Sequence, residues 1–257
     1  MKEAAILPML LRELKLPTMT RLWEDLNQTA VKQGWTPTRY LIALCEQELS
    51  DRESRRLSRC MTEAQLPRGK SLATFEFNAL PTLNKSQVLA FASGDIWIKN
   101  GGNLLIFGPS GVGKTHLAAA IGEKLVESGY RVFFTRTTEL VQKLQAAKRE
   151  LALPAALAKL DKYDCLILDD FGYVQKDQSE TSVLFELICE RYESKSLLIT
   201  CNQVFAEWDK IFDKTMAIAA VDRLIHHGTI FDLMNQDSYR KRAALARSTG
   251  KPEKEKK

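Results

Sequence analysis

The chain has 257 residues, of which 45% are apolar, and its formal net charge is +5. This length can bury one sizeable core and a second small one. Because no apolar run approaches the roughly 20 residues that cross a bilayer, and charged residues interrupt the first fourteen, we expect a soluble, cytoplasmic protein without a membrane partner.

The basic excess lies at the two ends of the chain. Residues 1–75 carry a net charge of +3 and residues 234–257 carry +5, whereas the middle of the chain carries −3. Basic ends of this kind indicate contact with an anionic partner, most often nucleic acid. Ordinary solubilising charge is the alternative.

Residues 1–66 predict a small all-helical domain that binds DNA or a protein partner. Leucines recur at helical spacing between 7 and 14, and the pattern restarts after Pro17. Gly34 ends this second helix. Thr36 and Pro37 are typical of a helix start, so a third helix is expected from there to about residue 65.

The second half of that third helix carries four arginines on one face: Arg52, Arg55, Arg56 and Arg59. Guanidinium groups suit phosphate oxygens, so this face is a candidate for following a nucleic-acid backbone without reading its sequence. A solvated face balanced by Asp51 and Glu53 is the alternative.

Residues 67–102, with their prolines and glycines, are expected to form a linker and lead-in to a second domain. From 103 to 245 apolar strand-like runs alternate with helical segments, which predicts a parallel five-stranded sheet covered by helices on both faces. The expected strands are 104–107, 131–135, 165–169, 197–200 and 229–232. The class is therefore α/β, and the basic tail 246–257 should be disordered.

One connection, between residues 135 and 165, is too long for a single crossover helix. It offers two helical pieces, 138–151 and 154–160. The first carries Lys143, Lys148 and Arg149, so we expect an inserted helix that faces DNA or another partner. A surface helical hairpin without a ligand explains the pattern equally well.

The first expected strand runs into a phosphate-binding motif, Gly108-x-x-x-x-Gly113-Lys114-Thr115. Glycines let successive N–H groups point into one concavity, and the helix that follows adds its positive dipole end. Lys114 can reach the β and γ phosphates, while Thr115 offers a hydroxyl to Mg²⁺. The predicted cradle comprises Gly108, Pro109, Ser110, Gly111, Val112, Gly113, Lys114 and Thr115.

A second motif indicates what happens to the nucleotide. A buried strand ends in Asp169 and Asp170. Asp169 is placed to hold Mg²⁺ through water, and Asp170 to meet a water that attacks the γ phosphate. The next strand is followed by Asn202, whose amide could orient that water.

Five motifs in this order and spacing resemble the AAA+ ATPases of the IstB/DnaC group. They are the P-loop, Leu-Ile-Leu-Asp-Asp, Thr-Cys-Asn-Gln, Val-Asp-Arg-Leu and Ser-Tyr-Arg. The N-terminal Leu-Arg-Glu-Leu-Lys-Leu-Pro-Thr-Met and the arginine-rich helix look more like the IstB-like transposition ATPases than like helicase loaders of the DnaC kind.

The resemblance implies an ATPase that uses ATP and Mg²⁺ at a site shared between subunits. Asn202 would be sensor 1, Arg240 sensor 2, and Arg223 the arginine finger that completes a neighbour's site. Proteins of this kind assemble into rings or spirals on double-stranded DNA and help a transposase select and insert into target DNA. Arg223 could instead be a plain helix-end residue that pairs with Asp222.

One residue departs from the family pattern, and other functions can be compared with this one. Most AAA+ ATPases have Glu at the position of Asp170, so either the attacking water is held closer or hydrolysis is slow. A replicative helicase loader shares every ATPase motif and is the alternative function. A small-molecule kinase lacks support, and no guanine-reading Asn-Lys-x-Asp follows the P-loop.

Overall fold

The computed structural model describes residues 2–172, 178–210, 214–236, 238 and 239. The chain divides into two compact units, Met1–Arg59 and Cys60–Lys257, and the division falls inside the third helix. The expected tail 246–257 lies outside the described residues. No helix in the described part is both long and apolar enough to cross a membrane.

The first unit contains the three predicted helices. They are α1 (Lys2–Glu13), α2 (Pro17–Gln33) and the first part of α3 (Pro37–Ala64). Gly34 ends α2 in a left-handed conformation with φ 64°, and its N–H returns to the carbonyl of Val31. This is the conformation that glycine adopts most readily at a helix end.

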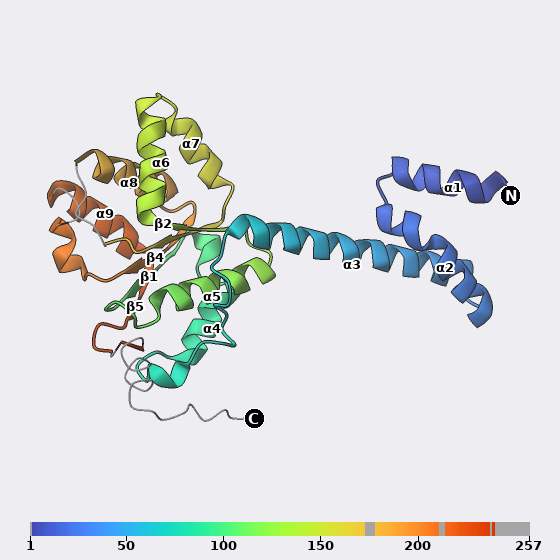
Figure 1. Cartoon of the computed structure of the whole chain (residues 1–257), viewed down its shortest axis with the longest axis horizontal. Helices are drawn as coiled ribbons and strands as arrows, with labels where there is room; N and C mark the ends of the chain where they lie inside the picture. Colours follow the sequence, from blue (N-terminus) through green and yellow to red (C-terminus); the bar gives the residue numbers. More distant parts are fainter. Residues whose placement is uncertain (1, 173–177, 211–213, 237, 240–257) are drawn as a thin grey trace, which may run out of the picture. The chain divides into compact units, whose positions relative to one another are not determined.

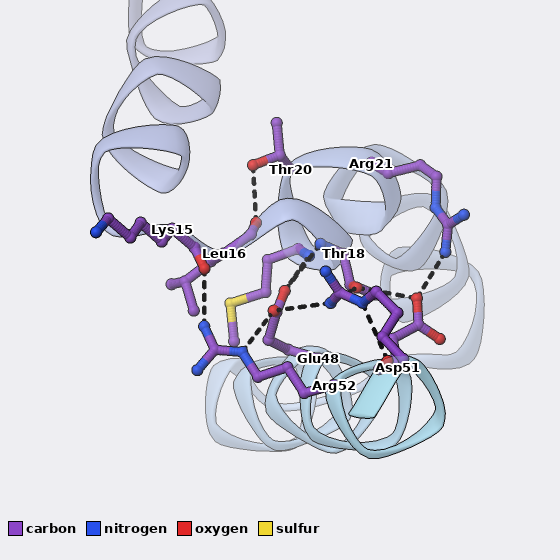
Figure 2. Close-up of polar contacts among 10 residues, drawn as sticks. Lys15, Leu16, Thr18, Thr20, Arg21, Glu48, Asp51 and Arg52 are labelled. Carbon is purple, nitrogen blue, oxygen red and sulfur yellow. Dashed lines mark hydrogen bonds and ion pairs between the residues drawn. The ribbon is translucent and has the colours of Figure 1, made fainter. Parts of the chain in front are cut away.

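Glu48 of α3 caps the start of α2. Leu16, at the cap position, offers no side-chain acceptor; instead the Glu48 carboxylate accepts the N–H groups of Thr18 at 2.8 Å and Met19 at 3.1 Å. Arg52 donates to the other carboxylate oxygen at 2.9 Å (Figure 2). Burial disfavours the charged form of Glu48, but these hydrogen bonds outweigh burial, and its pKa lies below the ordinary value.

The second unit is built on a parallel sheet with the strand order β2-β3-β4-β1-β5 (Figure 1). Its strands are β1 (Asn103–Phe107), β2 (Val132–Arg136), β3 (Cys165–Asp169), β4 (Ser196–Cys201) and β5 (Gly228–Asp232). Every strand predicted from the sequence is present to within one residue at either end. The three inner strands β3, β4 and β1 are buried throughout, as a sheet covered on both faces requires.

Helices cover both faces of this sheet (Figure 1). One layer contains α5 (Lys114–Glu127) with α4 (Lys85–Ser93) packed on it. The other contains α6 (Thr137–Arg149), α7 (Leu153–Asp161), α8 (Gln178–Arg191) and α9 (Lys214–His226). Alternate strand residues such as Leu105 and Leu166 enter the core of this second layer.

Residues 67–102 are more than the linker expected from their prolines and glycines. They contain α4 and two short 3₁₀ turns, Phe77–Ala79 and Ile98–Asn100. Val88, Phe91 and Trp97 are buried, and the Trp97 indole N–H donates to the carbonyl of Phe91 at 2.8 Å. These apolar side chains make the segment part of the second unit.

Candidate active site

The loop between β1 and α5 has the geometry that a phosphate cradle needs. Gly111 and Gly113 have φ values of 85° and 105°, where residues with a Cβ are strained. At Gly108 an added Cβ would stand 2.9 Å from the Leu233 Cβ. The Gly108 N–H donates to the Cys201 carbonyl at 3.1 Å, which ties the loop to the end of β4. These contacts fix where the free N–H groups of the loop and of the first turn of α5 point.

Lys114 is the first residue of α5, and only 6% of it is exposed. Its ammonium group donates to the carbonyls of Gly108 at 2.7 Å and Pro109 at 3.0 Å. The backbone of the loop therefore holds the charge of Lys114 at the cradle, where the prediction put it.

Asp169, at the end of β3, and Thr115, in the first turn of α5, are in contact beside the P-loop. The Thr115 hydroxyl lies 2.9 Å from one Asp169 carboxylate oxygen and 3.1 Å from the other. The Thr200 hydroxyl of β4 donates to Asp169 at 2.6 Å. A hydroxyl and a carboxylate side by side next to a phosphate loop are oxygen donors of the kind that Mg²⁺ prefers, so this donor set suits the ion that the fold implies.

The environment of Asp169 is buried and crowded with polar groups. Burial raises the pKa of Asp169, the hydrogen bond from Thr200 lowers it, and the neighbouring charge of Asp170 raises it again, so that the pKa lies above its ordinary value. A bound cation would favour the ionised carboxylate. Asp169 therefore has the electrostatics of a group that is completed by a positive ligand.

Asp170 leaves the strand in a left-handed conformation with φ 56°. This conformation is uncommon outside glycine, although aspartate tolerates it better than most residues. The Asp170 N–H donates to the Thr200 hydroxyl at 3.0 Å, which holds the turn in place. The exposed Asp170 side chain lines the same cavity as Lys114 and Thr115.

Asn202 follows β4 and also lines this cavity. Its amide oxygen is buried and has no hydrogen-bond partner among the described residues. A buried polar atom without a partner is costly unless a ligand or water satisfies it. Asn202 is therefore suited to contact a ligand or an ordered water in the cavity.

The cavity around these residues has a volume of about 670 Å³, which is within the usual range for sites of small-molecule ligands. Phe75, Ala79 and Leu80 give it an apolar wall beside the P-loop. The Phe75 ring meets the His116 ring edge-on at 5.2 Å. Such a wall suits a nucleobase.

Tyr239 closes the cavity from the C-terminal side. Its N–H donates to the Gly111 carbonyl at 3.0 Å, and its hydroxyl donates to Glu76 at 3.3 Å. The segment before the P-loop and the segment after β5 are therefore linked across the cavity mouth. Arg240, the predicted sensor 2 residue, lies outside the described residues.

Arg223 does not line the cavity of its own chain. It lies on α9, half-buried, with its guanidinium over the rings of Phe185 at 5.4 Å and Tyr192 at 5.9 Å. One of its N–H groups donates to the Ala219 carbonyl at 2.9 Å. The structure thus separates Arg223 from four other predicted catalytic residues, which it brings to one place together with the predicted metal ligand Thr115. These four are Lys114, Asp169, Asp170 and Asn202.

The four arginines predicted to contact DNA divide into two pairs. Arg52 donates to Glu48 and to the Lys15 carbonyl at 2.8 Å (Figure 2), and Arg55 donates to the carbonyl of Asp51 at 3.1 Å and lies 3.6 Å from Glu48. Arg56 and Arg59 are exposed, and neither makes a hydrogen bond or ion pair with another residue in the described part of the chain. The periodicity that placed all four on one face gave no sign of a buried carboxylate there.

The basic residues of α6 also differ from one another. Lys148 is tied to α8, since its ammonium donates to Glu186 at 2.7 Å and to Ser182 at 2.8 Å. Lys143 and Arg149 are exposed. The apolar face of α6, which includes Leu140 and Leu144, packs into the core, so α6 covers the sheet and presents only its polar side.

Three residues of the site escaped the sequence reasoning. Thr200 positions both Asp169 and Asp170, and it could have been recognised as a hydroxyl at the end of the strand next to theirs. Arg136 ends β2 and lines the cavity, where it could have been expected because carboxyl ends of parallel strands share one edge. Lys70 also lines the cavity, and nothing in its local sequence marks it.

Comparison with known proteins decides the family. A family model described as IstB-like ATP binding protein matches residues 9–246. The chain belongs to this family. It is 55% identical, over 97% of its length and 85% of the relative's, to a putative insertion sequence ATP-binding protein of Sinorhizobium fredii. It is 36% identical, over 91% of its length and 88% of the relative's, to the insertion sequence IS21 putative ATP-binding protein of Pseudomonas aeruginosa.

Solved structures agree with the fold of this IstB-like protein. The DnaC helicase loader matches with a TM-score of 0.55 at 23% identity, over 65% of this chain and 97% of that one. AMPPCP-bound DnaA from Aquifex aeolicus matches with a TM-score of 0.57 at 18% identity, over 75% and 58%. The second unit is thus an AAA+ P-loop domain, and the predicted fold class is confirmed. The description of its family is that of an ATP-binding protein.

Proposed function

We propose that this IstB-like protein hydrolyses ATP with Mg²⁺ at a site completed by a neighbouring subunit, binds double-stranded DNA as a ring or spiral, and helps a transposase select and insert into target DNA. The observation that carries the ATPase part is the pairing of Thr115 with Asp169 beside the P-loop, with Asp170 in the same cavity. The names of the relatives support the link to insertion sequences.

The residues of the cavity can share the work of hydrolysis. Loop N–H groups and Lys114 bind the phosphates, and Thr115 and Asp169 would hold Mg²⁺. When bound, this ion would offset part of the negative charge of the phosphates. Asp170 accepts a proton from the attacking water while the bond between the γ phosphorus and its bridging oxygen breaks. Asn202 donates from its amide to that water or to the γ phosphate.

Arg223 gives the shared site its test, since it lies apart from the cavity of its own chain. In this proposal it reaches the phosphates of the next subunit, as an arginine that acts in trans would. Arg223→Ala and Lys114→Ala proteins should each be inactive, but a mixture should regain part of the ATPase activity, because some interfaces combine an intact loop with an intact arginine. No recovery over a range of mixing ratios would refute the shared site.

The transposase partner is tested separately from the ATPase. Tagged protein with ATP and duplex DNA should retain the transposase encoded with it and should not retain a replicative helicase. The helicase-loader alternative makes the reverse prediction. The likeness to DnaC bears on the fold alone and does not favour that alternative.

A further inference from the structure

Two cations outside the P-loop line the nucleotide cavity. Lys70 lies in the segment between α3 and α4, and Arg136 is the last residue of β2. They belong to segments far apart in the sequence, yet both border the cavity that contains Asp170 and Asn202. The phosphate-loop motif does not account for either of them.

Neither cation is held by a partner in the described part of the chain. Among the described residues, the side chains of Lys70 and Arg136 form no hydrogen bond and no ion pair. Other half-buried or partly exposed cations of the same unit are paired, for example Arg131 with Glu63 at 2.9 Å and Lys195 with Asp164 at 2.8 Å. Lys70 and Arg136 are therefore available to an anion in the cavity.

Both cations line the cavity that contains Asp170, and Asp169 precedes Asp170 at the end of β3. In the parallel register of β2 and β3, Arg136 stands directly opposite Asp169. Lys70 is close enough for its charge to favour the ionised form of Asp169 and lower its pKa, although burial dominates. The loop N–H groups lie at the start of α5, so the carboxylate end is where the terminal phosphate of a triphosphate would reach.

Electrostatics favours positive charge near the two carboxylates and the terminal phosphate, in addition to the charge of a bound Mg²⁺. Asp169 and Asp170 place two carboxylates where a terminal phosphate would bring further negative charge. Lys114 alone offsets only part of this negative charge, because its ammonium also donates hydrogen bonds to two loop carbonyls. Two further cations that line the same cavity reduce this repulsion without changing the loop itself.

We propose that Lys70 and Arg136 bind the terminal phosphate of the bound nucleoside triphosphate from within the same subunit, and that they discriminate ATP from ADP. This inference depends on the proposed ATP site. The ligand chemistry is a terminal phosphoryl group, which a diphosphate lacks. Lys70 supplies a point charge, whereas the guanidinium of Arg136 can donate two parallel hydrogen bonds.

The test compares the affinities of two nucleotides in the full-length protein. Dissociation constants for ADP and for AMP-PCP, whose β–γ bridge resists hydrolysis, are measured with Mg²⁺ by competition against a fluorescent nucleotide. Lys70→Ala and Arg136→Ala should each weaken AMP-PCP about tenfold and change ADP less than about twofold. Lys159→Ala, which removes an exposed lysine of α7, is the matched control and should change neither.

Charge-preserving variants and the loop lysine sharpen the result. Lys70→Arg and Arg136→Lys should retain part of the preference for the triphosphate. If Lys70→Ala unfolds at a lower temperature than the unmodified protein, Lys70→Met takes its place, because methionine keeps the apolar stem of the side chain. An unchanged ratio of the two dissociation constants in Lys70→Ala or Lys70→Met and in Arg136→Ala would overturn the inference. Lys114→Ala separates the proposals, because its failure to weaken either nucleotide would instead refute the ATP site itself.

Discussion

The nucleotide cavity and the arginine face of α3 use charge in opposite ways. In the cavity, backbone groups hold Lys114, while Lys70 and Arg136 have no partner in the described chain. On α3, the buried Glu48 engages Arg52 and Arg55. A cation paired with a buried carboxylate is therefore less available to a ligand than one without a charged partner in the described chain, and sequence spacing alone does not reveal which case applies.

The largest expected effect is at the P-loop. Lys114→Ala should reduce ATP hydrolysis at least about a hundredfold, because it removes the only cation that the loop itself provides. The rate of phosphate release measures the effect, with Lys159→Ala as control. Hydrolysis at the rate of the unmodified protein would show that the cavity is not the catalytic centre.

The second effect concerns stability of the helical unit. Glu48→Ala leaves the first N–H groups of α2 without their acceptor and removes the buried partner of Arg52. Losing a helix cap of this kind costs about 1 kcal/mol, so thermal unfolding followed by circular dichroism should show a lower transition for this unit. Glu53→Ala, at an exposed carboxylate of the same helix, is the matched control.

The pH dependence of that unit follows from the same carboxylate. Since the pKa of Glu48 is lowered from 4.5 in the folded state, the charged form stabilises folding above that value. This contribution should disappear as the pH falls through the lower, folded pKa. In Glu48→Gln the loss of stability on acidification should be smaller, and an identical pH profile for both proteins would contradict the role of Glu48.

A third effect distinguishes the two pairs of arginines in DNA binding. Replacing Arg56 and Arg59 by alanine should reduce the slope of log K against log salt by about 1.8, or about 0.9 for each phosphate contact, without lowering the unfolding temperature. In contrast, Arg52→Ala and Arg55→Ala should each lower the unfolding temperature. If all four variants change the slope equally at unchanged stability, the internal contacts in Figure 2 do not restrict the DNA surface.

The smallest effect concerns Asp170, which is one methylene shorter than the glutamate usual in AAA+ ATPases. Asp170→Glu should raise the single-turnover rate several-fold, because the longer side chain brings the carboxylate closer to the attacking water. A rate that stays the same or falls would indicate that the turn at Asp170, with φ 56°, already places the carboxylate suitably.

Prediction from sequence is most specific where chemistry requires a fixed backbone geometry. The glycines of the P-loop and the carboxylates after β3 are forced by strand, turn and helix, so their spacing indicated their position. Lys70 was missed because the segment that carries it reaches the cavity only through tertiary packing. Glu48 was missed because a buried carboxylate that caps another helix has no signature in its own helix.

The proposed ATP-dependent assembly on DNA is tested most directly by sedimentation of purified protein with duplex DNA, in the presence of ADP or of ATP. The account predicts large complexes on DNA with ATP, few with ADP, and none with ATP for Lys114→Ala. Complexes of the same size with both nucleotides, or a protein that remains monomeric on DNA with ATP, would contradict it.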